Sequence, residues 1–68
     1  MSCTETYSVV GMTCDHCARS VSAEVGSLPG VTAVHVDLPS GQVTVTSEGV
    51  DTHHVRGAVE EAGYTLAP

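Results

Sequence analysis

Apolar and polar residues alternate along three short segments of the chain, a pattern that is typical of strands with one buried face. These segments are residues 4–10, 34–38 and 43–46. In the first, Tyr7 and Val9 fall on the same face, and Gly11 ends the alternation. Residues 39–41, Pro-Ser-Gly, separate the second and third segments, so we predict that these two strands form a hairpin.

Two further segments repeat their apolar residues every three or four positions, as amphipathic helices do. The first stripe consists of Ala18, Val21, Val25 and Leu28. The second consists of Val55, Ala58, Val59 and Ala62. The pair at 29–30, Pro-Gly, is predicted to end the first helix. Asp51 can cap the start of the second, Gly63 suits a left-handed stop after it, and residues 64–66 are expected to form a last short strand.

The order of elements is therefore βαββαβ. Because the strands have one apolar and one polar face, we expect an α+β fold in which both helices cover one face of a single antiparallel sheet. This is the ferredoxin-like sandwich. The length of 68 residues predicts one free-standing domain over residues 1–68. We identify no membrane span and no export signal, since no basic residue precedes an apolar block.

The charge balance narrows the classes of partner. Eight carboxylates and two arginines, Arg19 and Arg56, give a formal net charge of −6. Such a chain is not expected to bind nucleic acid or an anionic membrane surface. A protein partner with a basic face would be attracted to it. The alternative is that the acidity only keeps a small protein in solution.

The cysteines are Cys3, Cys14 and Cys17, and this odd number without a secretory signal argues against a disulfide framework. The Cys14–Cys17 spacing suits a metal or redox role in the reducing cytoplasm. Cys17 falls in the first predicted helical turn and Cys14 just before it, where free backbone N–H groups and the helix dipole favour thiolates. Two thiolates three residues apart can converge on a soft ion such as Cu(I) or Hg(II).

Residues 11–18, G-M-T-C-D-H-C-A, stand at the end of the first strand and resemble the heavy-metal-associated domain family. Within that family the chain is similar to free-standing bacterial copper chaperones. The resemblance runs from Tyr7 to Leu66 and includes L-P-G-V after the first helix and E-A-G-Y after the second. It implies that Cys14 and Cys17 bind Cu(I) and pass it by ligand exchange to a copper-transporting P-type ATPase or its metal-binding domain. A copper-responsive regulator is a second candidate partner, and no enzymatic activity is expected.

The neighbours of the two cysteines have separate predicted roles. Met12 is expected to pack in the core rather than bind metal as a thioether, and Thr13 to shape the loop through local hydrogen bonds. Strand and helix directions return Tyr64 to the metal end, where it resembles the tyrosine that bacterial chaperones place beside copper; plain packing is the alternative. His16 is expected to point outward and to act in copper-bridged dimers or larger assemblies, or at the partner contact, rather than as a first ligand.

The other candidate ligands are predicted to lie away from the metal. The histidines in this group are His35, His53 and His54. Cys3 precedes a strand of about seven residues and should lie ~25 Å from Cys14, as a spare thiol. Asp15 would slightly oppose thiolate formation at the helix start, and Arg19, one turn later, could offset its charge.

Two other functions are open at this point. A Cys-x-x-Cys at a helix start also serves thiol-disulfide oxidoreductases, although these need a longer βαβ framework. A scavenger of mercury, zinc or cadmium is the other possibility. Mercury-binding proteins with this loop are usually exported, and zinc favours four protein ligands, which two cysteines and His16 do not supply.

Overall fold

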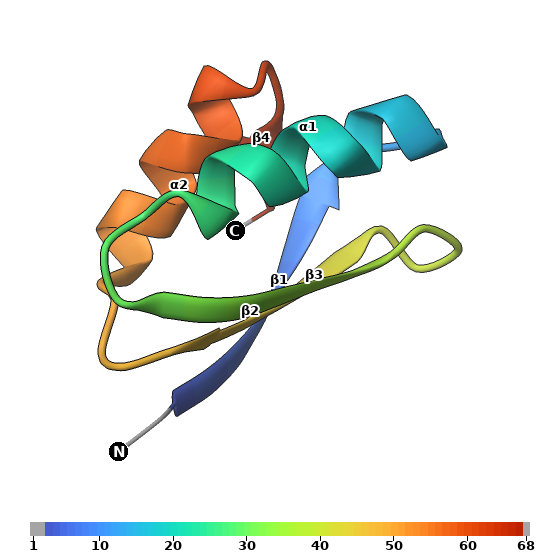
Figure 1. Ribbon diagram of the computed structural model, residues 1–68. Helices are drawn as coiled ribbons and strands as arrows, with labels where there is room; N and C mark the ends of the chain where they lie inside the picture. The colour runs from blue at the N-terminus through green and yellow to red at the C-terminus, as the bar shows by residue number, and fades with distance from the viewer. Residues whose placement is uncertain (1–2, 68) are drawn as a thin grey trace.

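The computed structural model describes residues 3–67, which form two helices and one four-stranded sheet. Figure 1 shows both helices lying on the same side of the twisted sheet. In chain order the elements are β1 (Cys3–Val10), α1 (Asp15–Gly26), β2 (Val31–Asp37), β3 (Gln42–Ser47), α2 (Thr52–Glu61) and β4 (Thr65–Leu66). The strands are ordered β2-β3-β1-β4, and every pairing is antiparallel. The predicted ferredoxin-like βαββαβ fold is confirmed.

Alternation along the strands decides which side chains the helices cover. In β3, Val43 and Val45 are buried beneath the helices. Thr44 points to the open face of the sheet, where its hydroxyl lies 3.4 Å from that of Thr6 on β1. The pairing of Tyr7 with Val43 places their side chains on the covered face. A sheet with one apolar face can therefore be covered by two helices and still present polar hydroxyls to water.

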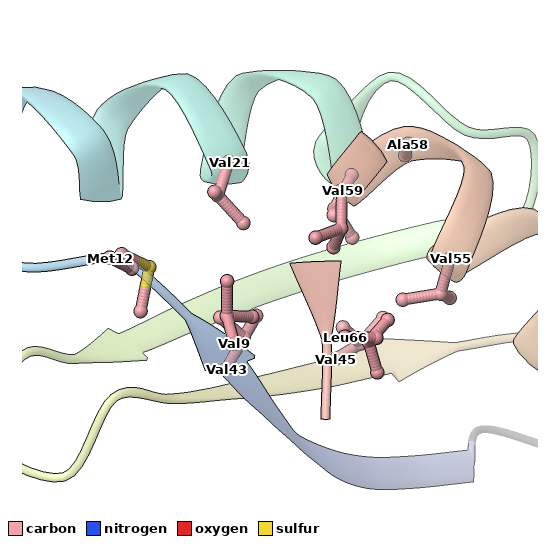
Figure 2. Packing of buried hydrophobic residues seen from close by; sticks show 10 residues of the cluster. Val9, Met12, Val21, Val43, Val45, Val55, Ala58, Val59 and Leu66 are labelled. Carbon is pink, nitrogen blue, oxygen red and sulfur yellow. The ribbon is translucent and has the colours of Figure 1, made fainter. Parts of the chain in front are cut away.

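The core is built almost entirely from valines, and Figure 2 shows them pointing toward one another from the helices and the sheet. Six valines have the lowest exposure: Val21, Val25, Val43, Val45, Val55 and Val59. The first two come from α1 and the last two from α2, as the predicted stripes require. Met12 closes the core at one end with 3% of its surface exposed.

The first helix ends earlier than predicted. We expected the Pro29-Gly30 pair to stop it, but α1 ends at Gly26 and Ser27 is its C-cap. The Ser27 N–H donates to the carbonyls of Ala23 and Val25, and the Ser27 hydroxyl donates to the Glu24 carbonyl at 2.8 Å. These bonds satisfy the last helical carbonyls before the proline is reached.

Strand boundaries also differ by a few residues from those predicted. β1 begins at Cys3, β2 runs from Val31 to Asp37, and β4 begins at Thr65 rather than at residue 64. Leu38 lies in the turn after β2, although its half-buried side chain still packs against the core. Apolar alternation therefore continues one residue past the end of the regular pairing, whereas it misses the first three residues of β2.

The second helix begins and ends where the sequence predicts. The Asp51 carboxylate accepts the His53 N–H at 3.0 Å and caps the N-terminus of α2. Gly63 follows the helix with φ +94°, the left-handed conformation that glycine adopts without strain. The chain then turns back toward the sheet and reaches Tyr64. Within the described residues 3–67, neither helix has the length and apolar character needed to cross a membrane.

Candidate metal site

A short loop connects β1 to α1 and sets the position of both cysteines. Gly11 turns the chain with φ +89°, and a Cβ atom at this position would lie 3.6 Å from Cδ1 of the Tyr64 ring. The left-handed backbone conformation is what favours glycine here, since a Cβ atom at that distance from the ring would make only an ordinary van der Waals contact. Met12 follows and inserts into the core, so the loop is anchored one residue before Thr13 and two before Cys14.

The two cysteine side chains converge at the start of α1. Cys14 is the N-cap of the helix, and its Sγ accepts the Cys17 N–H at 3.4 Å. The Sγ atoms of the two residues lie 3.0 Å apart, and both are free thiols. Cys14 is exposed and Cys17 half-buried. The predicted placement of one cysteine before the helix and the other in its first turn is confirmed, and the capping role of Cys14 is an addition.

Hydrogen bonds make the Cys17 thiol more acidic than the thiol of an ordinary cysteine. The Tyr64 side chain contributes the largest effect, followed by the Cys14 thiol and the backbone of Thr13, and together they lower the pKa of Cys17 from 9.0 to about 7. Desolvation acts in the opposite direction but is outweighed. The same hydrogen bond raises the pKa of Tyr64, because its hydroxyl is held as a donor to the Cys17 sulfur. A large fraction of Cys17 is therefore thiolate near neutral pH.

The structure brings some predicted site residues together and separates others. Tyr64 lies at the metal end of the molecule, against Gly11 and hydrogen-bonded to Cys17, as the topology requires. Met12 is a core residue. Thr13 contributes a backbone hydrogen bond to the Cys17 sulfur, a role that residue type alone does not reveal. His16 is exposed on the first turn of α1.

The remaining candidate ligands lie elsewhere, as predicted. Cys3 begins β1 opposite Ser47, at the other end of that strand from the metal loop. His53 and His54 are exposed in the first turn of α2, and His35 is exposed on β2. Among residues 3–67, no group of three or more histidine, cysteine or acidic side chains is arranged to hold a metal ion. The described residues therefore bring two protein thiols together at this site.

Comparison with known proteins identifies the family of this chain. The sequence pattern of the heavy-metal-associated domain matches residues 6–65, nearly the whole chain. The chain belongs to this family. Copper chaperone CopZ from Bacillus subtilis (strain 168) is 42% identical to it over 65 residues, which cover 93% of this chain and 94% of that protein. The chain is therefore similar over nearly its whole length to a protein that is named a copper chaperone.

Two solved structures of heavy-metal-associated proteins show the same architecture. The structure named CopZ metallochaperone superposes with a TM-score of 0.91 at 33% identity, covering 96% of this chain and all of that one. The N-terminal domain of ZntA in its Zn(II) form gives a TM-score of 0.85 at 33% identity, covering 94% of this chain and 88% of that domain. One fold thus serves proteins that are named for different metals, so the metal must be argued from the site itself.

Proposed function

We propose that this protein is a cytoplasmic Cu(I) carrier. The observation that carries the proposal is the pair of free thiols 3.0 Å apart at the N-terminus of α1, one of them with its pKa lowered to about 7. Thiolates are soft ligands that favour Cu(I). The helix N-terminus and the Tyr64 hydroxyl stabilise the negative charge of a monovalent ion held by two thiolates. The named function of the Bacillus relative supports the same metal.

Delivery to a copper-transporting P-type ATPase, or to its metal-binding domain, is the second part of the proposal. Cys14 is exposed, so an incoming thiolate can approach a copper ion held beside it. Transfer would then pass through a copper ion shared by thiolates of carrier and acceptor: a Cu–S bond to the acceptor forms for each Cu–S bond to Cys14 or Cys17 that breaks, and copper stays Cu(I). The net charge of −6 favours an acceptor surface richer in lysine and arginine, because opposite charges speed encounter at low salt. A copper-responsive regulator with free thiols would take the ion by the same exchange.

Zinc is the competing cargo, because the ZntA domain adopts this fold in its Zn(II) form. A zinc ion ordinarily requires four ligands. The described part of this chain supplies two thiols and no third neighbouring donor group. Two thiolates suit an ion of low coordination number, so copper is the better match.

Anaerobic titration against competing chelators tests this assignment. We expect one Cu(I) per chain at low loading, held more tightly than Zn(II) under the same conditions, with the cysteines still reduced by mass. A protein that binds Zn(II) more tightly than Cu(I), or that passes electrons to a disulfide substrate without binding metal, would contradict the proposal. The Cys14→Ser/Cys17→Ser double variant is the control, because its fold should be retained while both thiols at the site are removed.

A copper-bridged homodimer or larger assembly follows from the exposure of the site. A second molecule can cover the bound ion and contribute its own Cys14 and Cys17. His16 is exposed on the same turn and is positioned to contribute to that contact rather than to the first copper site. Native mass spectrometry of the parent and His16→Ala above one Cu(I) per chain tests this. We expect fewer dimers for the variant and an unchanged first binding step; a first step that disappears would contradict this role.

A further inference from the structure

Two side chains of opposite charge lie beside the metal loop without a partner in the described structure. Asp15 is the first residue of α1 and Arg19 comes four residues later. Both are exposed, and within residues 3–67 neither side chain takes part in an ion pair or hydrogen bond. Residues four apart on a helix share one face. Arg19 is also one of only two cationic side chains, apart from histidine, in a chain with eight carboxylates.

Both charges lie on the first two turns of the helix that begins at the metal loop. Asp15 directly follows the N-cap Cys14, and Arg19 lies about 6 Å further along the helix axis. Arg19 also lines the hollow between α1 and β2, together with Ser22 and His35. One face of the first two turns of α1 therefore presents a negative charge and then a positive one, beginning directly after Cys14.

We propose that Asp15 and Arg19 form a self-complementary pair that sets the two-fold register of a copper-bridged dimer of this chain. The proposal rests on the proposed Cu(I) function. In a two-fold contact, residue i of one copy meets residue j of the other and the reverse holds too. With the two metal loops facing each other, Asp15 of each copy approaches Arg19 of the other, which forms two ion pairs around the shared metal.

Charge also explains why a second copy needs such a pair. Each copy carries a formal charge of −6, so two copies repel each other at long range. A dimer then depends on attraction within the contact itself. Arg19 is the cation in the first two turns of α1, next to the thiols, whereas Arg56 lies on α2. Asp15 and Arg19 together make a surface that is neutral overall and complementary to itself.

Charge-reversal variants test the pairing. Asp15→Lys places two cations opposite each other in the dimer, and Arg19→Glu places two carboxylates opposite each other. We expect each variant alone to dimerise about tenfold more weakly than the parent above one Cu(I) per chain, since two attractive pairs become repulsive. An equimolar mixture of the two should recover a heterodimer near the strength of the parent, because every opposed pair then has opposite sign. Native mass spectrometry with one variant labelled with ¹⁵N distinguishes the heterodimer.

Matched variants away from the contact are the controls. Arg56→Glu changes the net charge as Arg19→Glu does, and Glu24→Lys, in the last turn of α1, matches Asp15→Lys. Both controls should dimerise like the parent. Circular dichroism and the affinity for the first Cu(I) are measured on every variant, so that a failure to fold or to bind copper is recognised. Neutral variants Asp15→Asn and Arg19→Gln replace any reversal that unfolds.

The outcomes separate this proposal from the proposed function. If the parent binds copper and dimerises, but the mixture forms no more heterodimer than either variant forms homodimer, the pairing is wrong and the carrier function stands. If the parent binds one copper and remains monomeric at every loading, the pairing is wrong as well. If the parent binds no Cu(I), the carrier function itself is wrong.

Discussion

The two ends of the molecule carry the same kinds of side chain, yet only one of them brings two thiols together. The metal end holds Cys14, Cys17, His16 and Tyr64, and the opposite end holds Cys3, His53, His54 and Tyr7. Each end has a helix N-terminus with a capped first turn. Residue types alone therefore do not make the site; their arrangement around one helix start does.

The two helix starts show where the difference arises. At α1 the capping atom is the Cys14 sulfur, with the Cys17 sulfur 3.0 Å away. At α2 the capping atom is an oxygen of Asp51, which accepts the His53 N–H. The two tyrosines differ in the same way: Tyr64 is hydrogen-bonded to the Cys17 sulfur, whereas the Tyr7 hydroxyl lies 3.3 Å from that of Thr52. The start of α2 therefore has oxygen groups where the start of α1 has two sulfur atoms, and it lacks the pair of converging thiols that suits a soft ion.

The largest expected effect comes from removing a thiol at one end or the other. Cys14→Ser and Cys17→Ser should each weaken Cu(I) binding by more than ~100-fold. Mutating a residue that only hydrogen-bonds to a metal ligand already lowers metal affinity by about 10–100-fold. Serine is a good N-cap, so the Cys14 variant should stay folded. Cys3→Ser should bind like the parent, since Cys3 lies at the far end of β1. Chelator competition measures all three, and an equal loss for Cys3→Ser would contradict the geometry.

The two tyrosines provide the next comparison. Tyr64→Phe removes the hydroxyl that contributes most to lowering the pKa of Cys17, so this pKa should rise from about 7 toward 9.0. Cu(I) affinity near neutral pH should fall by about tenfold, within the range for a partner of a metal ligand. Tyr7→Phe loses only the contact with Thr52 and should leave copper binding unchanged. Equal behaviour of the two variants would show that Tyr64 only packs against the loop.

The pH dependence of the metal end should follow Cys17. Its pKa is lowered, so Cys17 is mostly thiolate above pH 7 and becomes protonated below it. Protons then compete with the metal, and apparent Cu(I) affinity should fall by up to about tenfold per pH unit as the pH drops below 7. Alkylation by iodoacetamide, followed residue by residue by mass spectrometry, should show a midpoint near pH 7 at Cys17. A midpoint near 9.0 would mean that the hydrogen bonds around the sulfur do not form in solution.

At the far end, the cap of α2 should matter for stability alone. Asp51→Ala removes the acceptor of the His53 N–H and should lower the free energy of unfolding by about 1 kcal/mol, as other capping residues do. Copper affinity measured on the folded protein should not change. A loss of affinity would mean that the two ends are coupled through α2. Urea denaturation and chelator competition provide the two measurements.

The smallest effect is expected at Met12. Met12→Leu keeps the side-chain volume and should cost less than about 1.5 kcal/mol of stability. Because Met12 is 3% exposed and packs in the core, Cu(I) affinity should remain within about twofold of the parent, since no ligand or ligand partner is removed. A loss comparable to that of a cysteine variant would instead identify the thioether as a ligand.

The order of elements, the covered face of the sheet and the convergence of the two thiols were predictable from the amino-acid sequence alone. The direction of side chains repeats every two residues in a strand and every three or four in a helix. Valines at these spacings therefore specify which segments form the sheet and which form the helices that cover it. The Asp51 cap and the Gly63 stop were predictable because each depends on one residue and its local backbone. The convergence of Cys14 and Cys17 was predictable for the same reason, since three positions at a helix start span a single turn.

Tertiary structure decided the features that depend on contacts between distant segments. The sequence placed Tyr64 at the metal end through strand and helix directions, but its hydrogen bond to Cys17 depends on how closely β4 and the metal loop pack. The helix α1 ends at Gly26 because hydrogen bonds of Ser27 cap it there, three residues before the Pro-Gly pair that was predicted to end it. The acidity of Cys17 likewise combines a side chain from the C-terminal segment with local backbone groups. Periodicity reports local geometry, whereas these features arise only when the sheet and both helices have closed around the core.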